Sequence, residues 1–211
     1  DIDRVEIKGK AILFESGIYA VLPKDMPETL ALAALDVAGA PAQVAKLARP
    51  CQSVVILGSA GKSGMLCAYE AVKRVGPTGT VIGLVRNEKE AALLARVSDK
   101  IKVVIADATK PIEVLNAVLA ANDGKEVDIA INCVNVQNTE MSTILPVKDL
   151  GIAYFFSMAT SFTKAALGAE GVGKDVTMIV GNGYTKDHAA ITLEELRESA
   201  VLREIFNELY V

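Results

Sequence analysis

A short apolar run that leads into a glycine-rich turn, SVVILGSAGKSG from Ser53 to Gly64, constrains this sequence more than any other stretch. Its consecutive β-branched residues are typical of a strand buried on both faces. Gly58, Gly61 and Gly64 follow at intervals of three, and an apolar helical stretch comes next. A strand, a glycine turn and a helix in this order predict a dinucleotide-binding site. The turn lets the backbone approach a pyrophosphate, and the helix N-terminus presents unpaired N–H groups.

The spacing of the glycines departs from the usual G-x-G-x-x-G pattern, because Ser59 stands where the first glycine is expected. A serine can still turn tightly there, and the adjacent Gly58 can supply the flexibility. The alternative interpretation is a glycine-rich loop that packs closely for structural reasons alone. A phosphate-binding P-loop is excluded, since the first glycine of that motif would fall at Ile56, inside the strand.

The composition is typical of a protein with a sizeable core: 211 residues, 51% of them hydrophobic, with a net charge of -4. A nucleic-acid binder would show a basic excess and more aromatic side chains for stacking. No apolar run reaches the length of a membrane span. Cys51, Cys67 and Cys133 lie far apart and fit neither a disulfide framework nor a metal site. We therefore expect a cytoplasmic homo-oligomer with a small-molecule substrate and no metal, nucleic-acid or membrane partner.

Strands and helices alternate from residue 53 onward. Further strands are expected at Gly79–Arg86, Lys102–Ala106, Val127–Cys133, Ala153–Met158 and Val176–Val180. Helices are expected over about 88–97, 109–121 and 192–209, with Pro111 in the first turn of the second one. This alternation predicts an α/β fold, a doubly wound six-stranded parallel sheet that binds its ligand along the carboxyl ends of the strands.

Residues 1–50 do not follow this alternation. Three short strands are expected there, at Val5–Lys8, Ala11–Phe14 and Tyr19–Leu22. A helix from Glu28 to about Ala38 follows, and Gly39-Ala40-Pro41 is expected to separate it from another helix that ends at Leu47. The segment is too short for a core of its own. We therefore assign 1–50 to the end of another, β-rich domain with its connecting helix, and 51–211 to the dinucleotide-binding domain with C-terminal helices.

Longer segments carry a resemblance to a known family. The turn GSAGKSGM, the segment AINCVNVQNTE and the segment FFSMATSFTKAALGAEGVGKD resemble the medium-chain dehydrogenase/reductase superfamily, and within it the dehydrogenases that act on diaminohexanoate. The resemblance covers nearly the whole chain from Lys10 onward. It implies a Rossmann domain and NAD(P)-dependent oxidative deamination at C3 of 3,5-diaminohexanoate, a step of lysine fermentation. The products would be 5-amino-3-oxohexanoate, ammonia and reduced cofactor.

The superfamily also carries a β-rich, GroES-like catalytic lobe before the cofactor domain. Residues 1–50 resemble only the closing strands of that lobe. The resemblance therefore implies that this chain supplies the cofactor-binding part. No acid–base constellation can be assigned in it, so its catalytic residues stay unassigned.

The end of the strand expected at Gly79–Arg86 bears on the choice of cofactor. NAD sites commonly carry an acidic residue there, about 20 residues beyond the glycines, that accepts a hydrogen bond from the ribose 2′-hydroxyl. This chain has Arg86 and Asn87 instead, and an arginine suits a 2′-phosphate. Glu88 either turns back to the ribose or stabilises a helix N-terminus. Both NAD and NADP stay open.

The other strand ends carry further candidates. Asp107, followed by Ala108, either accepts a hydrogen bond from adenine or caps the next helix. The segment Cys133-Val134-Asn135 ends its strand near the expected cofactor ribose, and Cys133 is either a small buried apolar residue or a nucleophile. The run Ser157-Met158-Ala159 either binds the nicotinamide carboxamide or ends an ordinary strand. The candidate cofactor-binding residues are Gly58, Ser59, Ala60, Gly61, Lys62, Ser63, Gly64, Arg86, Asn87, Asp107, Ala108, Cys133, Asn135, Ser157, Met158 and Ala159.

Two other classes of function remain compatible with this pattern. One is a non-catalytic domain that senses nucleotides, and the other is a methyltransferase-like domain that uses the same turn for S-adenosylmethionine. Lys62 either contacts phosphate or is solvated. The charged run Glu194-Glu195, Arg197-Glu198 and Arg203-Glu204 is interpreted as a solvated helix face with i,i+4 pairs.

Overall fold

The computed structural model describes residues 6–181 and 184–211. The strands are β1 (Ser53–Leu57), β2 (Thr80–Val85), β3 (Ile101–Ile105), β4 (Val127–Asn132), β5 (Val147–Phe155) and β6 (Thr177–Val180). They form one six-stranded sheet in the order β3-β2-β1-β4-β5-β6, and every neighbouring pair is parallel. The predicted doubly wound α/β sheet is confirmed.

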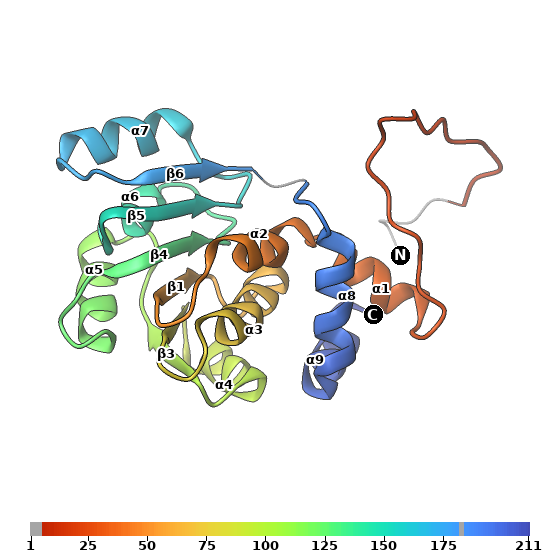
Figure 1. The fold of residues 1–211 in the computed structure, drawn as a ribbon, viewed down its shortest axis with the longest axis horizontal. Coiled ribbons are helices and arrows are strands. Elements are labelled where there is room, and N and C mark those ends of the chain that lie inside the picture. Colours follow the sequence, from red (N-terminus) through yellow and green to blue (C-terminus); the bar gives the residue numbers. More distant parts are fainter. Residues whose placement is uncertain (1–5, 182–183) are drawn as a thin grey trace.

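Alternation within the strands gives the sheet two apolar faces. Val54 and Ile56 point into one core cluster, whereas Val55 and Leu57 point into another, so β1 is buried on both faces. The first face is covered by α3 (Lys62–Val75) and α4 (Glu88–Val97). The second is covered by α5 (Pro111–Ala121), α6 (Glu140–Ile144) and α7 (Phe162–Gly171), as Figure 1 shows. The sheet is thus the middle of three layers.

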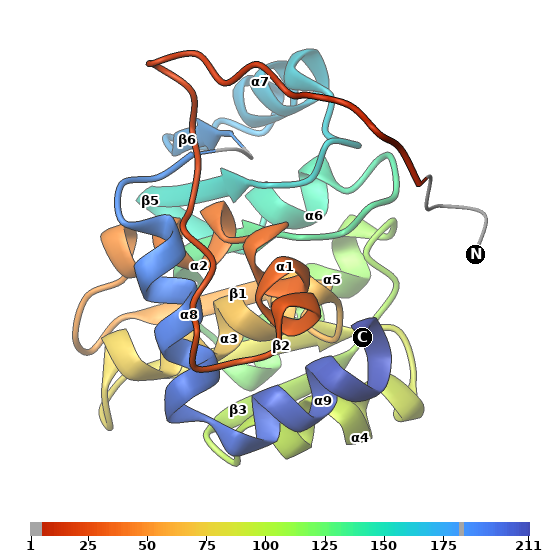
Figure 2. The ribbon, with the colours of Figure 1, turned by 90° about the vertical axis from the view of Figure 1, so that its right-hand side faces the viewer.

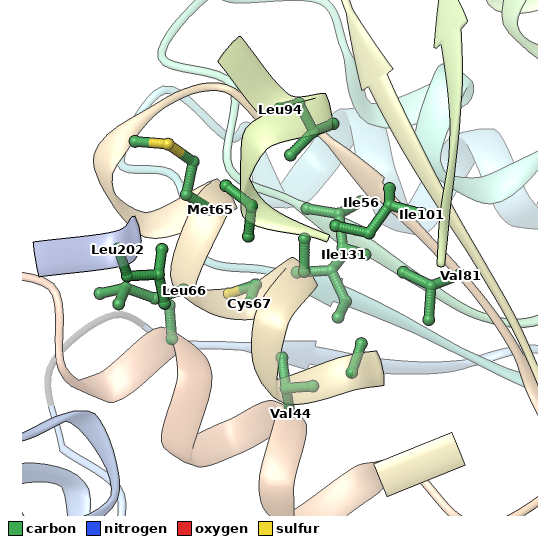
Figure 3. Packing of buried hydrophobic residues seen from close by; sticks show 14 of the residues in the cluster. Val44, Ile56, Met65, Leu66, Cys67, Val81, Leu94, Ile101, Ile131 and Leu202 are labelled. Atoms are coloured by element: carbon green, nitrogen blue, oxygen red, sulfur yellow. The ribbon is translucent and has the colours of Figure 1, made fainter. Parts of the chain in front are cut away.

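Helices from both ends of the chain extend the first face. These are α1 (Glu28–Leu35), α2 (Gly39–Leu47), α8 (His188–Glu198) and α9 (Ala200–Tyr210). Figure 2 shows α8 and α9 beside α1. Val44 of α2, Leu66 of α3 and Leu202 of α9 belong to one buried cluster (Figure 3). Residues 28–47 therefore share the core of the sheet.

The break between the first two helices lies earlier than predicted. Residues 36–38 form the turn, and Gly39-Ala40-Pro41 lie inside α2. Pro41 is tolerated because it occupies the first turn, where backbone N–H groups have no acceptor within the helix. The prediction that these three residues end a helix is wrong.

The predicted N-terminal strands are absent from the described residues, since 6–27 contain no strand. Val5, the first residue of the strand predicted at Val5–Lys8, lies outside the described part. The segment loops out from the body of the molecule (Figure 1) and exposes large apolar side chains, among them Ile12 and Phe14. A strand needs a partner for its backbone groups, and no strand among the described residues pairs with this segment. The C-terminal end of the segment contacts α8, where Arg197 Nε donates a hydrogen bond to Asp25 at 2.8 Å.

Two boundaries on the β5 side of the sheet also differ from the predictions. The strand expected at Ala153–Met158 begins at Val147 and ends at Phe155. Leu150 within it has a φ of 63°, and the pairing with β4 shifts between Val127 and Ile129. The first part of this strand lacks the apolar pattern of a buried strand, because Lys148 and Asp149 are charged. These two residues and Leu150 are all exposed.

Within the described residues, no single helix is long and apolar enough to cross a membrane. The bent pair α1 and α2 passes that test by length and composition. Leu30, Ala34, Ala40 and Val44 of this pair are nonetheless buried in the core.

Candidate functional site

A cavity of about 420 Å³ opens at the carboxyl edge of the sheet. Its walls are the loops that follow β1, β2, β3 and β4, and it lies where β1 and β4 are neighbours. The strand order reverses at this point, which is where doubly wound sheets bind their ligands. The cavity brings together the predicted residues Gly58, Ala60, Gly61, Arg86, Asp107, Ala108, Cys133 and Asn135.

The glycine turn after β1 depends on the backbone conformation of Gly58 and on a close approach at Gly64. Gly58 has a φ of 77°, a conformation that favours glycine, so the flexibility predicted for this position is confirmed. A Cβ atom on Gly64 would lie 2.1 Å from the Gly58 carbonyl oxygen, so only glycine lets α3 pack this closely on the turn. A Cβ on Gly61 would lie 3.3 Å from the same oxygen and would meet no other described heavy atom within 4 Å. Gly61 thus leaves the mouth of α3 open toward the cavity.

Ser59 supports this turn from behind. Its side chain is fully buried and donates a hydrogen bond to the Ile56 carbonyl at 2.7 Å. Its backbone N–H donates to the Leu84 carbonyl. Ser59 therefore holds the turn against β1 and β2, and it does not line the cavity.

The N-terminus of α3 faces the cavity without a side-chain cap, because its N-cap residue is Gly61. The side chain of Ser63 is buried and does not line the cavity. Lys62 turns toward the helices instead: its Nζ lies 3.0 Å from Asp36 Oδ2 and 5.2 Å from the centroid of the Tyr210 ring. The backbone N–H groups of the first turn are thus the donors that this end of α3 presents.

At the end of β2, Arg86 lines the cavity together with Glu90 of α4, a residue that the sequence prediction missed. One Glu90 oxygen accepts from the Arg86 backbone N–H at 2.9 Å, and the other accepts from Arg86 Nε at 2.8 Å and also contacts Nη2. Partial burial opposes ionisation of Glu90, but the hydrogen bonds from Arg86 outweigh it and lower the pKa of this carboxyl. Asn87 caps α4 by accepting from Glu90 N–H and does not line the cavity.

Asp107 lies in the cavity wall after β3. Its Oδ1 accepts hydrogen bonds from the Thr109 N–H at 2.9 Å and the Thr109 hydroxyl at 2.7 Å. These bonds lower the pKa of Asp107. The residue that caps α5 is Lys110, so the interpretation of Asp107 as that cap is wrong.

The loop after β4 is held by a buried amide. Asn132 donates to the Thr139 and Thr143 hydroxyls at 2.8 and 3.0 Å, and its oxygen accepts from the Val134 N–H at 2.9 Å. This network fixes the backbone that presents Cys133 and Asn135 to the cavity. Sequence reasoning missed Asn132, although an asparagine at the end of an otherwise apolar strand is a usable signal.

The predicted nicotinamide residues lie one strand further along the same edge. Ser157 and Met158 line a separate cavity of about 300 Å³ at the ends of β5 and β6. The Ser157 hydroxyl oxygen accepts from the Ala159 N–H at 3.1 Å, which shapes the loop. The structure therefore places these residues beside the main cavity and not within it.

The strand order, the parallel pairing and the glycine turn at the switch point define a Rossmann-like fold. Solved structures agree with this class. An alcohol dehydrogenase from Thermotoga maritima superposes with a TM-score of 0.64 at 17% identity, over 82% of this chain and 48% of that one. One from Aeropyrum pernix gives 0.60 at 21% identity, over 84% and 51%. At these identities the similarity shows the fold alone. A mycobacterial protein in complex with NADPH gives 0.59 at 15%, over 91% and 58%.

Two curated relatives are similar to this chain over its whole length. The chain is 87% identical over all of its 211 residues to L-erythro-3,5-diaminohexanoate dehydrogenase of Fusobacterium nucleatum subsp. nucleatum. It is 71% identical to the enzyme of the same name from Acetoanaerobium sticklandii. It spans 61% of the length of each of these relatives. No family model matches the chain. The resemblance to diaminohexanoate dehydrogenases is thereby confirmed.

Proposed function

We propose that this chain is the NAD(P)-binding part of a dehydrogenase that oxidatively deaminates 3,5-diaminohexanoate to 5-amino-3-oxohexanoate. The observation that carries the proposal is the cavity at the β1–β4 switch point, walled by a glycine turn, in a chain 87% identical to an enzyme of that name. One structural neighbour, the mycobacterial protein, was solved as a complex with NADPH. The assignment of 1–50 to the end of a preceding lobe and its connecting helix belongs to the same proposal, with the helices over 28–47 packed on the sheet.

In this proposal the pyrophosphate lies against Gly61 and the first turn of α3, because a negative charge is favoured by the unpaired N–H groups there. The adenosine lies toward the ends of β2 and β3, between Arg86 and Asp107. The nicotinamide extends past Cys133 and Asn135 toward the loop at Ser157. These residues would bind and orient the cofactor, and its nicotinamide ring, when bound, accepts the hydride from C3 of the substrate.

The charges around Arg86 favour NAD over NADP. Glu90 already accepts three hydrogen bonds from Arg86, so the guanidinium is neutralised before any ligand arrives. A 2′-phosphate would have to displace this carboxylate or remain beside it, and like charges at short range repel. A 2′-hydroxyl carries no charge and escapes this repulsion. In this proposal Glu90, from the first turn of α4, is the acidic residue that accepts a hydrogen bond from the ribose 2′-hydroxyl.

Replacing Glu90 with glutamine should therefore shift the preference toward NADP. We expect NADP to bind about tenfold more tightly to the Glu90→Gln variant, since Arg86 then meets the phosphate without a competing charge. Calorimetric titration with both cofactors measures the change. Arg86→Ala should weaken NADP more than NAD. Glu88→Gln, on the same helical turn but outside the cavity, serves as the control. An unchanged NADP affinity in Glu90→Gln would contradict this assignment.

The proposed function is tested in two steps. A titration of the chain with NAD, NADP and S-adenosylmethionine should show binding of a nicotinamide cofactor; tight binding of S-adenosylmethionine alone would point to a methyltransferase-like domain. The chain should then replace the matching segment of the Fusobacterium enzyme in a chimera. We expect NADH formation that depends on 3,5-diaminohexanoate and saturates with it. A folded, NAD-binding chimera without turnover would leave nucleotide binding standing and remove the enzymatic role.

A further inference from the structure

Two cysteines approach each other behind the glycine turn. Cys133 follows β4 and lines the cavity, whereas Cys67 lies on α3 and is fully buried. Their sulfur atoms are 3.9 Å apart. Figure 3 shows Cys67 among the apolar side chains of the core. The third cysteine, Cys51, is exposed and hydrogen-bonds Thr78, so it lies outside this pair.

The two thiols differ in their exposure to a molecule in the cavity. Cys133 is half-buried in a cavity wall, so a small oxidant in the cavity can reach it. Cys67 has no exposed surface, and its sulfur lies next to that of Cys133. Burial, and secondarily the contact with Cys133, raise the pKa of the Cys67 thiol, so Cys133 is the thiol that meets the oxidant first.

We propose that Cys67 and Cys133 form a modification site, a dithiol that a peroxide entering the cofactor cavity converts into a disulfide. The Cys133 sulfur attacks hydrogen peroxide, the O–O bond breaks, and a sulfenic acid and water form. The Cys67 sulfur then attacks the Cys133 sulfur, the S–O bond breaks, and the hydroxyl leaves with the Cys67 proton as water. The two thiols lose two electrons in total, and the peroxide gains them.

The geometry allows the second step with a small movement. The sulfurs must close from 3.9 Å to the disulfide bond length of about 2.05 Å, and rotation about the Cα–Cβ bonds can supply part of this movement. The bond would connect α3 to the end of β4. A Cβ on Gly58 would lie 3.3 Å from the Cys133 carbonyl group, so the backbone that carries one end of the new bond is next to the glycine turn.

Occupancy of the cavity should control the reaction. A dinucleotide bound against Gly58 and Asn135 would cover Cys133, which lines the same cavity. The disulfide itself does not depend on the proposed function, but its protection by NAD does. Oxidation would accordingly take place in the cofactor-free protein.

The test uses the Cys51→Ser variant, which retains only these two thiols and avoids cross-links through the exposed cysteine. After treatment with hydrogen peroxide, we expect a monomer that has lost two hydrogens, no thiol reactive toward N-ethylmaleimide after unfolding, and a peptide that joins Cys67 to Cys133. Cys51→Ser/Cys67→Ala should instead stop at an oxidised Cys133, and Cys51→Ser/Cys133→Ala should keep Cys67 reduced. Circular dichroism verifies that each variant is folded.

The same experiment separates the two proposals. With NAD at ten times its calorimetric Kd, disulfide formation should slow about tenfold, in proportion to the empty fraction. Disulfide formation in a chain that binds no NAD would uphold the dithiol and refute the proposed function. NAD binding without protection would refute the position of Cys133 beneath the cofactor. Over-oxidation of Cys133 without a bond to Cys67, or no reaction at all, would overturn the inference.

Discussion

Replacing Gly61 with valine is expected to abolish dinucleotide binding and to leave the fold intact. Gly61 is exposed at the mouth of α3 and lines the cavity. A side chain there would occupy the space that the pyrophosphate needs in order to reach the helix N-terminus. We expect a loss of at least about 100-fold in affinity, or roughly 2.7 kcal/mol.

The fold should survive because the backbone of Gly61 is an ordinary extended one, with φ of -80° and ψ of 168°. Valine adopts this conformation readily. The first new atom, Cβ, would lie 3.3 Å from the Gly58 carbonyl oxygen and requires only a small adjustment of the turn. Gly64 offers a contrast: the 2.1 Å approach of its Cβ to the same oxygen means that Gly64→Ala should lower stability as well as binding.

Calorimetric titration with NAD and thermal unfolding measure these two effects separately. Gly171→Val is a matched control, because a Cβ on Gly171 at the end of α7 meets no described heavy atom within 4 Å. Tight NAD binding by a folded Gly61→Val variant would show that the phosphate lies elsewhere.

The sheet could be predicted from the sequence because its signals are local. Val54 to Leu57 are uninterrupted apolar residues before a glycine turn, and β1 is indeed buried on both faces. The positions of the turn, Arg86, Asp107 and Cys133 followed from the strand ends, since parallel strands present their carboxyl ends at one edge. Whether the cavity binds NAD(P) stays a prediction until the titrations are done.

The features that were missed depend on contacts between segments distant in sequence, or on the way a helix is rotated. Apolar spacing in residues 6–22 suggests strands, but strands require partners that the described residues do not provide. Glu90 is three residues beyond Asn87. It lines the cavity because Asn87 caps α4 and so places Glu90 in the first turn of that helix. The charged run over α8 and the start of α9 was interpreted as a solvated helix face, which is wrong for Glu195: it is fully buried where α8 packs on α3.

Glu195 should make the protein progressively less stable as the pH rises above about 4.5, the usual pKa of a glutamate. Neither of its carboxyl oxygens has a hydrogen-bond partner among the described residues, and both are buried. Burial raises the pKa of Glu195 well above 4.5, and the nearby Glu70 and Glu198 add to this, against the opposing charges of Lys73 and Arg74. The folded protein therefore holds this carboxyl protonated over a range in which the unfolded chain ionises it.

The sign of the effect follows from this difference. Below about pH 4.5 both states are protonated and Glu195 causes no pH-dependent loss. Between that value and the raised pKa of the folded state, the unfolded chain binds fewer protons, so the free energy of unfolding falls by up to about 1.4 kcal/mol per pH unit. Above the raised pKa the loss is complete and stays constant.

Glu195→Gln removes this ionisation while it keeps nearly the same shape, so the variant should lose less stability than the parent as the pH rises from 4.5 toward the raised pKa of Glu195. The expected difference grows by roughly 1 kcal/mol per pH unit, measured by urea unfolding at a series of pH values. Glu194→Gln, the exposed neighbour that pairs with Arg197, controls for the loss of one charge from α8. Parallel stability profiles for Glu195→Gln and the parent would mean that Glu195 is ionised and solvated in the folded protein. The buried carboxyl of Glu195 thus makes the stability of the α3–α8 contact depend on pH between about 4.5 and the raised pKa of the folded state.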